Sequence, residues 1–245
     1  PYNLGWLKTE VFDRWKAGDK DYDVIQFPSI QNPYYPKEEF ERAKATLPAW
    51  KFKMFYLGEF AKPEGLVYDD FDTARHVIEP FEIPKDWRRI VGVDFGYNNP
   101  TAAVWIAISP DDVMYVYKEY YERNKIPQET GSDIVRLSEG EYIGALFCDP
   151  SYPAAIEEYR RLGLPAVSAR TEVKEGIEDV IGRFKTDRLF VFRGLTNFLD
   201  EIENYRWKVH NDSIQDEPVK EYDHLMDALR YAIASYTKIG MVQLW

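Results

Sequence analysis

Short apolar runs in the middle of the chain predict a sheet. Residues 90–94 and 101–109 are two such runs, and the Gly/Asn/Pro turn between them is typical of a hairpin. Residues 113–121 alternate between apolar and polar positions, a pattern that predicts a third strand. The chain from residue 89 onward is therefore expected to begin with three successive strands.

After these strands, amphipathic segments alternate with short apolar ones. Helices are predicted at 127–138, 153–162, 174–186, 195–203 and 223–237. Between them, strands are predicted at 143–149, 165–168 and 188–192, followed by a hairpin with arms at 205–209 and 218–220. Three strands followed by alternating helices and strands indicate an α/β fold, a mixed sheet with helices on its faces.

The first 60 residues have a different pattern. Apolar residues recur there at helical spacing and predict a helix that ends near Gly18: Trp6, Leu7, Val11, Phe12 and Trp15. A short strand is expected at 23–27, and helices at 37–47 and 50–57. The prolines of residues 61–88 indicate an irregular connector. The predicted division is an appendage (1–60), a connector (61–88) and an α/β domain (89–245).

Composition restricts the class of protein. A hydrophobic content of 45% over 245 residues is enough for one sizeable core. The single cysteine, Cys148, excludes an intramolecular disulfide and favours a reducing compartment. No apolar run approaches the length of about 20 residues that spans a bilayer, and the first residues lack the pattern of a signal peptide. Because the chain does not begin with Met, we expect it to be a fragment of a longer protein.

Charge and missing motifs narrow the function further. The net charge of −11, from 31 basic and 42 acidic residues, argues against a strong, sequence-independent grip on nucleic acid. A nuclease remains compatible with this charge, because metal ions locally reverse the charge of a site built from carboxylates. The sequence has no complete P-loop, no zinc-type Cys/His cluster, no Gly-x-Ser-x-Gly and no Gly-x-Gly-x-x-Gly after a strand.

Three aspartates stand where different local patterns end. Asp94 and Asp149 each end an apolar strand, and such carboxylates lie at the rim of a sheet, where open α/β folds bind ligands. Asp227 interrupts the apolar run of the last helix and is expected near its buried side, where a carboxylate needs a partner. Together they predict an oxygen-rich pocket for Mg²⁺ or Mn²⁺, and paired ions of this kind cleave phosphodiesters.

Each aspartate also has a purely structural interpretation. Asp94 fits a solvent-facing turn, although Gly96 and the residues after it are expected to leave room for a phosphate or a metal. Asp149 fits the N-cap of the helix that follows. Arg230, three residues after Asp227, is a suitable ion-pair partner for it.

Three further residues are accessory candidates. Asp223 lies four residues before Asp227 on the same helix face and also suits the N-cap position. His224 is either structural or a group that transfers a proton or contacts a phosphate beside the metals. Lys174 opens a helix after Asp149 and either meets a phosphate or is simply solvated.

The order of these motifs resembles the large subunit of tailed-phage terminases, which pair an ATPase with a nuclease of RNase H-like fold. The matching segments are Val-Asp-Phe-Gly-Tyr at 93–97, Phe-Cys-Asp-Pro at 147–150 and His-Leu-Met-Asp-Ala-Leu-Arg-Tyr at 224–231. Upstream, residues 1–6, 28–33 and 56–60 resemble the last part of the ATPase region, and residues 65–68 resemble the entry to the nuclease. The resemblance covers nearly the whole chain. It implies an RNase H-like mixed sheet flanked by helices, with a small, mostly helical remnant of the ATPase region before it.

Carried over by position, the resemblance makes Asp94, Asp149 and Asp227 the metal-binding catalytic triad for two Mg²⁺ or Mn²⁺ ions. Asp94 would bridge both ions, while Asp149 and Asp227 would each hold one. His224 and Asp223 fall in the matching stretch as accessory residues. The implied activity is an endonuclease that cleaves double-stranded DNA during phage genome packaging, with metal-activated water attacking the phosphodiester and the second ion stabilising the leaving oxygen.

The resemblance also implies partners and limits. The hairpin with Arg206, Trp207 and Lys208 resembles the family's extension near the DNA path, although an exposed hairpin that covers the sheet edge is the simpler interpretation. The implied partners are double-stranded DNA, the portal protein and the small terminase subunit, with no membrane, in the host cytoplasm during virus assembly. The phosphate-binding parts of the ATPase are missing from this sequence, so we expect neither ATP hydrolysis nor motor activity from it.

Three alternatives stay open. A transposase or junction resolvase of RNase H type shares the carboxylate chemistry, but such proteins usually carry a basic DNA-binding module, and none is visible here. An actin/hexokinase-like ATPase has a phosphate loop similar to Asp94-x-Gly-x-x-x-x-Thr101, but it needs a second such loop and a longer chain. The third alternative is a non-catalytic assembly protein that keeps the fold.

Overall fold

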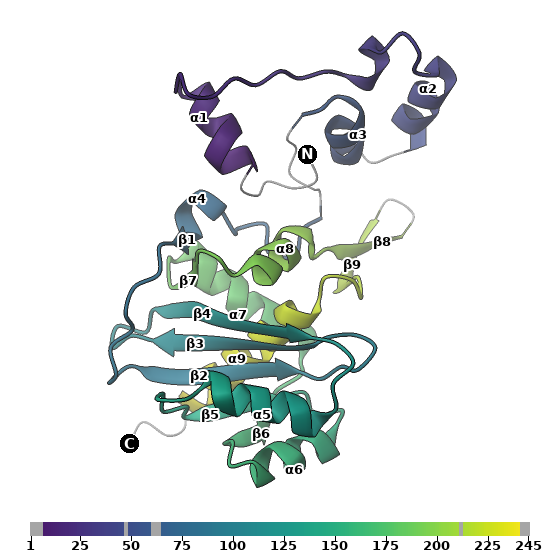
Figure 1. Ribbon diagram of the computed structural model, residues 1–245. Helices are drawn as coiled ribbons and strands as arrows, with labels where there is room; N and C mark the ends of the chain where they lie inside the picture. The colour runs from purple at the N-terminus through teal and green to yellow at the C-terminus, as the bar shows by residue number, and fades with distance from the viewer. Residues whose placement is uncertain (1–6, 47–48, 60–64, 211–212, 241–245) are drawn as a thin grey trace. The chain divides into compact units, whose positions relative to one another are not determined.

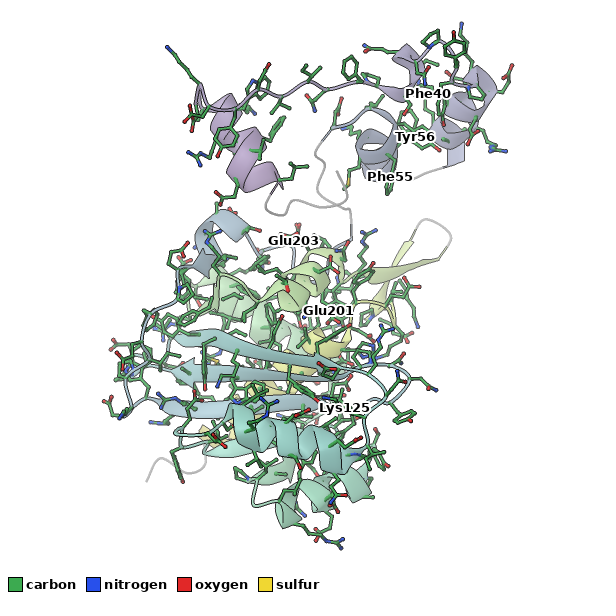
Figure 2. The ribbon with its side chains drawn as sticks, viewed as in Figure 1. Phe40, Phe55, Tyr56, Lys125, Glu201 and Glu203 are labelled. Atoms are coloured by element: carbon green, nitrogen blue, oxygen red, sulfur yellow. The ribbon has the colours of Figure 1, made fainter. Side chains whose placement is uncertain are left out.

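The computed structural model describes residues 7–46, 49–59, 65–210 and 213–240, and the chain divides into two compact units, Pro1–Leu66 and Val67–Trp245 (Figure 1). The helical elements of the first unit are a π-helix (Leu7–Phe12), α1 (Asp13–Lys16), a 3₁₀ turn (Ser29–Gln31), α2 (Lys37–Thr46) and α3 (Ala49–Tyr56). Its small core is aromatic: Phe40 packs edge-on against Phe52, and Phe52 stacks on Tyr56, with ring centroids 5.1 and 5.4 Å apart. Phe40 and Tyr56 are labelled in Figure 2.

The second unit is built on a seven-stranded sheet with the order β1-β7-β4-β3-β2-β5-β6. Its strands are β1 (Val77–Ile78), β2 (Arg88–Asp94), β3 (Thr101–Ile108), β4 (Met114–Glu122), β5 (Ala145–Cys148), β6 (Ala166–Ser168) and β7 (Leu189–Phe192). The β2–β3 and β3–β4 pairs are antiparallel, whereas β2–β5, β5–β6, β4–β7 and β1–β7 are parallel. The sheet is therefore mixed, as the sequence predicted.

Helices cover both faces of this sheet, so alternate strand residues enter two different cores. Val91 and Val93 pack with residues of α5 (Pro127–Leu137) and α6 (Pro153–Arg161). Ile90 and Val104 pack with residues from the other face, where α7 (Val173–Lys185), α8 (Thr196–Asn204) and α9 (His224–Gly240) lie. The central strand β3 is buried along its whole length, which explains its continuous apolar run. No helix in the described part of the chain is both long and apolar enough to cross a membrane.

The C-terminal ends of β2 and β5 meet at one edge of the sheet. These strands are parallel neighbours in which Val93 pairs with Cys148, so the next residue of each chain, Asp94 and Asp149, comes to the same rim. Helix α9 packs on β2 and begins at this edge, and it brings Asp227 to the same place. The topology thus assembles three residues that are 55 to 133 positions apart in the sequence.

The structure corrects three sequence predictions. Residues 23–27 form no strand, because the first unit offers no partner strand within the described residues, and Ile25 and Phe27 stay exposed. Residues 67–88 are part of the second unit rather than of a connector: they form α4 (Thr73–His76) and β1, and they bury Tyr68 and Phe71 in its core. The hairpin arms are β8 (Trp207–His210) and β9 (Ser213–Pro218) rather than 205–209 and 218–220. The second arm was misplaced because the sequence of β9 is mostly polar and does not look like a strand. Residues 211 and 212, where the turn was expected, lie outside the described residues.

Candidate active site

Asp94 and Asp149 lie side by side at the edge of the sheet. The backbone N–H of Asp149 donates to the carbonyl oxygen of Val93 at 2.9 Å, which extends the β2–β5 ladder by one bond. Both carboxylates open into a hollow of about 610 Å³, called the acidic hollow below. Its lining residues are Asp94, Phe95, Gly96, Tyr97, Asn98, Asn99, Asp149, Lys220, Asp223, His224, Asp227 and Tyr231.

The first turn of α9 supplies the opposite wall of the acidic hollow. Asp223 immediately precedes the helix, and its carbonyl oxygen accepts the N–H of Asp227 at 2.6 Å. Nδ1 of His224 lies 3.1 Å from Oδ2 of Asp94 and 3.9 Å from Oδ1 of Asp223. The predicted site residues of β2, β5 and α9 therefore meet in one place.

The electrostatics of Asp94 and His224 depend on each other. Burial raises the pKa of Asp94 to about 6; Asp227 and Asp149 add to this rise, whereas the hydrogen bond with His224 opposes it. Burial disfavours the charged form of His224, but Asp94, Asp223 and Glu201 outweigh this cost and raise its pKa above the usual value. The charge of each group therefore depends on the protonation of the other, at a site where carboxylates repel one another.

Asp227 is buried and is held by two cations. Nη2 of Arg230 lies 2.8 Å from Oδ1 of Asp227, which confirms the ion pair suggested by their spacing. The same guanidinium donates to the carbonyl oxygen of Thr171 at 3.2 Å, and Arg230 is only 2% exposed. On the other side, Nζ of Lys220 lies 3.4 Å from Oδ2 of Asp227 and 3.4 Å from Oδ2 of Asp223. A buried carboxylate thereby gains the partners that its desolvation requires.

Asp149 does not act as the N-cap of the following helix. The N-cap of α6 is Tyr152, and no side chain caps this helix end. Instead, Oδ1 of Asp149 accepts the N–H of Ser151 at 2.9 Å, and the hydroxyl of Ser151 donates to the other oxygen. Asp149 is thus fixed by a local turn while its carboxylate lines the acidic hollow.

The turn after Asp94 is closer packed than the sequence suggested. A β-carbon at Gly96 would lie 2.5 Å from the carbonyl oxygens of Asn99 and Pro100. The hydroxyl of Thr101 also donates to the carbonyl oxygen of Gly96 at 2.8 Å. The space at the β-carbon position of Gly96 is therefore filled by the turn itself, whereas Gly96, Asn98 and Asn99 still line the acidic hollow, as the sequence suggested.

Two residues at or behind the site were missed in the sequence. Lys220 lies in the acidic hollow, but a lysine next to a hairpin gives no signal of such a place. The other is Glu201 of α8, which is labelled in Figure 2. It is only 2% exposed. Its carboxylate accepts the hydroxyl of Tyr121 at 2.8 Å and the N–H of Leu225, in the first turn of α9, at 2.6 Å. Burial raises the pKa of Glu201 to about 7. Only the tertiary contact between α8 and α9 shows this role.

The remaining candidates lie apart from the acidic hollow. Lys174 is exposed in the first turn of α7 and is not among the lining residues. Arg206 is half-buried, and burial lowers its pKa. Trp207 packs against the core of the second unit. Lys208 pairs with Glu217 across the hairpin at 2.6 Å. Of these three residues, which were predicted to contact DNA, Trp207 already uses its ring to pack against the core.

The acidic hollow has the chemistry of a site for hard divalent cations. Four aspartates and one histidine line it, and carboxylate oxygens are the ligands that Mg²⁺ and Mn²⁺ prefer. Among the described residues, however, no three His, Cys, Asp or Glu side chains are arranged to hold one ion in this conformation. Asp227 and Asp223 are instead turned to Lys220. The donor set fits such an ion, and two of its carboxylates are engaged by Lys220 in this conformation.

Comparison with known proteins identifies relatives of this fold and site. The chain is 24% identical to the large terminase subunit of Escherichia phage T5 over 223 residues, which are 84% of this chain and 50% of that protein. It thus spans about half the length of the curated relative that it matches. No protein-family model matches the chain.

Solved structures agree with this match. The large terminase of a thermophilic bacteriophage is 25% identical with a TM-score of 0.63, over 98% of this chain and 60% of that one. The large terminase nuclease domain of bacteriophage SPP1, solved with bound Mn, is 18% identical with a TM-score of 0.53, over 70% of this chain and 98% of that one. The chain is therefore a homologue of the large subunit of phage terminases, and its second unit has the RNase H-like fold of their nuclease domains.

Proposed function

We propose that this chain is a metal-dependent endonuclease that cleaves double-stranded DNA during phage genome packaging. The observation that carries the proposal is the convergence of Asp94, Asp149 and Asp227, from β2, β5 and α9, on one acidic hollow. Homology to large terminase subunits supports the same activity, and the Mn bound to the SPP1 nuclease domain supports the use of divalent ions.

The residues of the acidic hollow have distinct roles in this proposal. Asp94, Asp149 and Asp227 hold two ions, Mg²⁺ or Mn²⁺, which when bound supply an activated water and stabilise the leaving oxygen. His224 positions Asp94 through the 3.1 Å contact between Nδ1 and Oδ2 and holds a proton there at low pH. Arg230 fixes Asp227 from the buried side.

Substrate engagement depends on more than this chain. The net charge of −11 argues against a strong, sequence-independent affinity of this chain for DNA. Arg206 and Lys208 of the hairpin are candidate local contacts, and in this proposal the remaining affinity comes from parts that the T5 relative has and this chain does not span. Assembly with a portal protein and a small terminase subunit in the host cytoplasm, and translocation by an ATPase, belong to the whole protein in this proposal.

Nicking of supercoiled plasmid by the purified chain, with Mn²⁺ or Mg²⁺ and with EDTA, tests the proposal. We expect nicking only with added metal. Asp94→Asn, Asp149→Asn and Asp227→Asn should each lower the rate by at least about a hundredfold, as expected for groups that take part directly in the chemistry. Glu157→Gln is the matched control, because Glu157 is an exposed carboxylate of α6 with only surface ion pairs.

Two outcomes would contradict the proposal. Cleavage that survives in all three variants would show that these aspartates are not the catalytic residues. Cleavage that is equally fast with EDTA would show that the reaction does not need a metal ion. Hydrolysis of ATP by this chain would instead favour the ATPase alternative.

A further inference from the structure

The two cations around Asp227 differ in how firmly they are held. Arg230 reaches Asp227 from inside the protein, with 3% of its side chain exposed, and the carbonyl oxygen of Thr171 holds the same guanidinium. Lys220 reaches Asp227 and Asp223 from the solvent side, with 65% of its side chain exposed. Arg230 is therefore a fixed partner, whereas Lys220 can withdraw without leaving a cavity.

The position of Lys220 in the chain allows such a movement. The N–H of Val219 donates to the carbonyl oxygen of Arg206 at 2.8 Å and makes the last bond next to the β8–β9 ladder. Lys220 follows this bond and precedes Asp223 by three residues. Its ammonium is thus placed by a short segment between the hairpin and α9, and it sits on a flexible four-carbon stem.

The negative charges of the acidic hollow favour a cation beside them. Four aspartates line it, and they repel one another unless positive charge compensates them. Lys220 contacts one oxygen of each of two aspartates, Oδ2 of Asp223 and Oδ2 of Asp227, while Arg230 contacts Oδ1 of Asp227. A divalent ion that uses Asp227 from the hollow therefore competes with Lys220 and not with Arg230.

We propose that Lys220 is an exchangeable counter-ion: it compensates Asp223 and Asp227 while no metal is present and withdraws when a divalent cation binds. This inference rests on the proposed function, because it concerns the same metal site. Its consequence is that Lys220 weakens metal binding and protects the metal-free fold from repulsion among the carboxylates.

Titration of the metal-free chain with Mn²⁺, by calorimetry and by the spin resonance of free Mn²⁺, tests the exchange without any cleavage assay. Lys220→Ala should bind Mn²⁺ about three- to tenfold more tightly than the wild type, the range expected when two partly exposed ion pairs no longer compete. This difference should shrink as salt is added, because ions screen exposed pairs. Lys220→Arg should stay close to the wild type.

Lys185→Ala is the matched control. Lys185 is also an exposed lysine, with 59% of its side chain accessible, and it pairs with an aspartate, Asp70, at 3.5 Å outside the acidic hollow. Its loss should leave Mn²⁺ affinity unchanged. A second measurement uses thermal unfolding: without metal, Lys220→Ala should melt below the wild type, and Mn²⁺ should raise its melting temperature by more than that of the wild type.

The outcomes separate this inference from the proposed function. Asp94→Asn should abolish the binding if the ions bind where we propose. If the wild type shows this Asp94-dependent binding but Lys220→Ala binds equally or more weakly, the exchange is wrong and the proposed function stands. If neither the wild type nor Lys220→Ala binds Mn²⁺ in an Asp94-dependent way, both are wrong.

Discussion

Gly92 of β2 lies directly beneath the carbonyl oxygen of Ala228 in α9. A β-carbon at position 92 would stand only 1.9 Å from that oxygen and 3.0 Å from the β-carbon of Ala232. The missing side chain therefore lets the helix backbone approach the strand. Because Asp94 lies two residues after Gly92 and Asp227 one residue before Ala228, the same close approach sets the spacing of the two carboxylates.

We expect Gly92→Ala to destabilise the chain by at least about 2 kcal/mol, because overpacking against backbone cannot be relieved by a side-chain rotation. The displaced helix should also weaken Mn²⁺ binding, since ligands from β2 and α9 would move apart. Urea unfolding and Mn²⁺ titration measure the two effects. In Gly144→Ala, the control, the added methyl group meets only the carbonyl oxygen of Arg89 at 3.6 Å, so both quantities should change little.

The affinity for Mn²⁺ should rise with pH. Burial raises the pKa of Asp94 to about 6, so this carboxylate is protonated on the acidic side of that value and a metal ion must displace the proton. Affinity should therefore increase up to about tenfold per pH unit below pH 6 and level off only after His224, whose pKa is raised above its usual value, has also lost its proton. Calorimetry from about pH 5 to about pH 8 measures the slope. A profile that is flat, or that falls with pH, would contradict this role of Asp94.

The sequence was sufficient to predict that Asp94, Asp149 and Asp227 come together, but not which groups hold them. Asp94 and Asp149 follow apolar runs, so the end of each strand is visible in the sequence, and Arg230 follows Asp227 at helical spacing. Lys220 and Glu201 carry no such signal, because their partners are 3 to 80 residues away and depend on how the hairpin, α8 and α9 pack.

The fold, too, could be predicted from the sequence only in part. Strands with continuous or alternating apolar patterns were predicted, because burial on one or both faces dictates the pattern. The two-residue strand β1 escaped prediction, since it consists of Val77 and Ile78 only and lies among prolines. The strand predicted at 23–27 failed for the opposite reason: its pattern was suitable, but strands need a hydrogen-bonding partner that the pattern does not reveal.

Glu201 should make the stability of the chain depend on pH. Burial raises its pKa to about 7, so the folded state binds a proton more tightly than the unfolded chain does. Its contribution is fully favourable below the unfolded pKa and is lost as the pH rises through about 7, by up to about 3 kcal/mol. Urea unfolding at about pH 5 and about pH 8 should show this loss in the wild type and a smaller one in Glu201→Gln.

Glu201→Ala separates positioning from charge. This change leaves the N–H of Leu225 without its partner at the start of α9 and should cost about 1–3 kcal/mol. It should also weaken Mn²⁺ binding, because His224 and Asp227 belong to the same first turn of α9. Glu201→Gln keeps a hydrogen-bond acceptor at this position and should bind Mn²⁺ nearly as the wild type does. Equal Mn²⁺ affinity in Glu201→Ala would show that Glu201 serves stability alone.

Gly176→Ala should release Asp227 from its fixed partner. A β-carbon at this position of α7 would lie 2.6 Å from Cγ and 3.0 Å from Cδ of Arg230. These atoms belong to the aliphatic part of a side chain whose guanidinium is held by Asp227. The guanidinium must then shift from Asp227, leaving a buried carboxylate undercompensated, and we expect a loss of about 1–3 kcal/mol without metal. Mn²⁺ should restore more stability to this variant than to the wild type, because the ion replaces the lost charge. Urea unfolding without and with Mn²⁺ measures both effects.

The control is Gly182→Ala on the same helix, where no atom lies within 4 Å of the added carbon and stability should stay equal or rise. If Gly176→Ala behaves like Gly182→Ala in both measurements, Arg230 does not depend on Gly176 to hold Asp227.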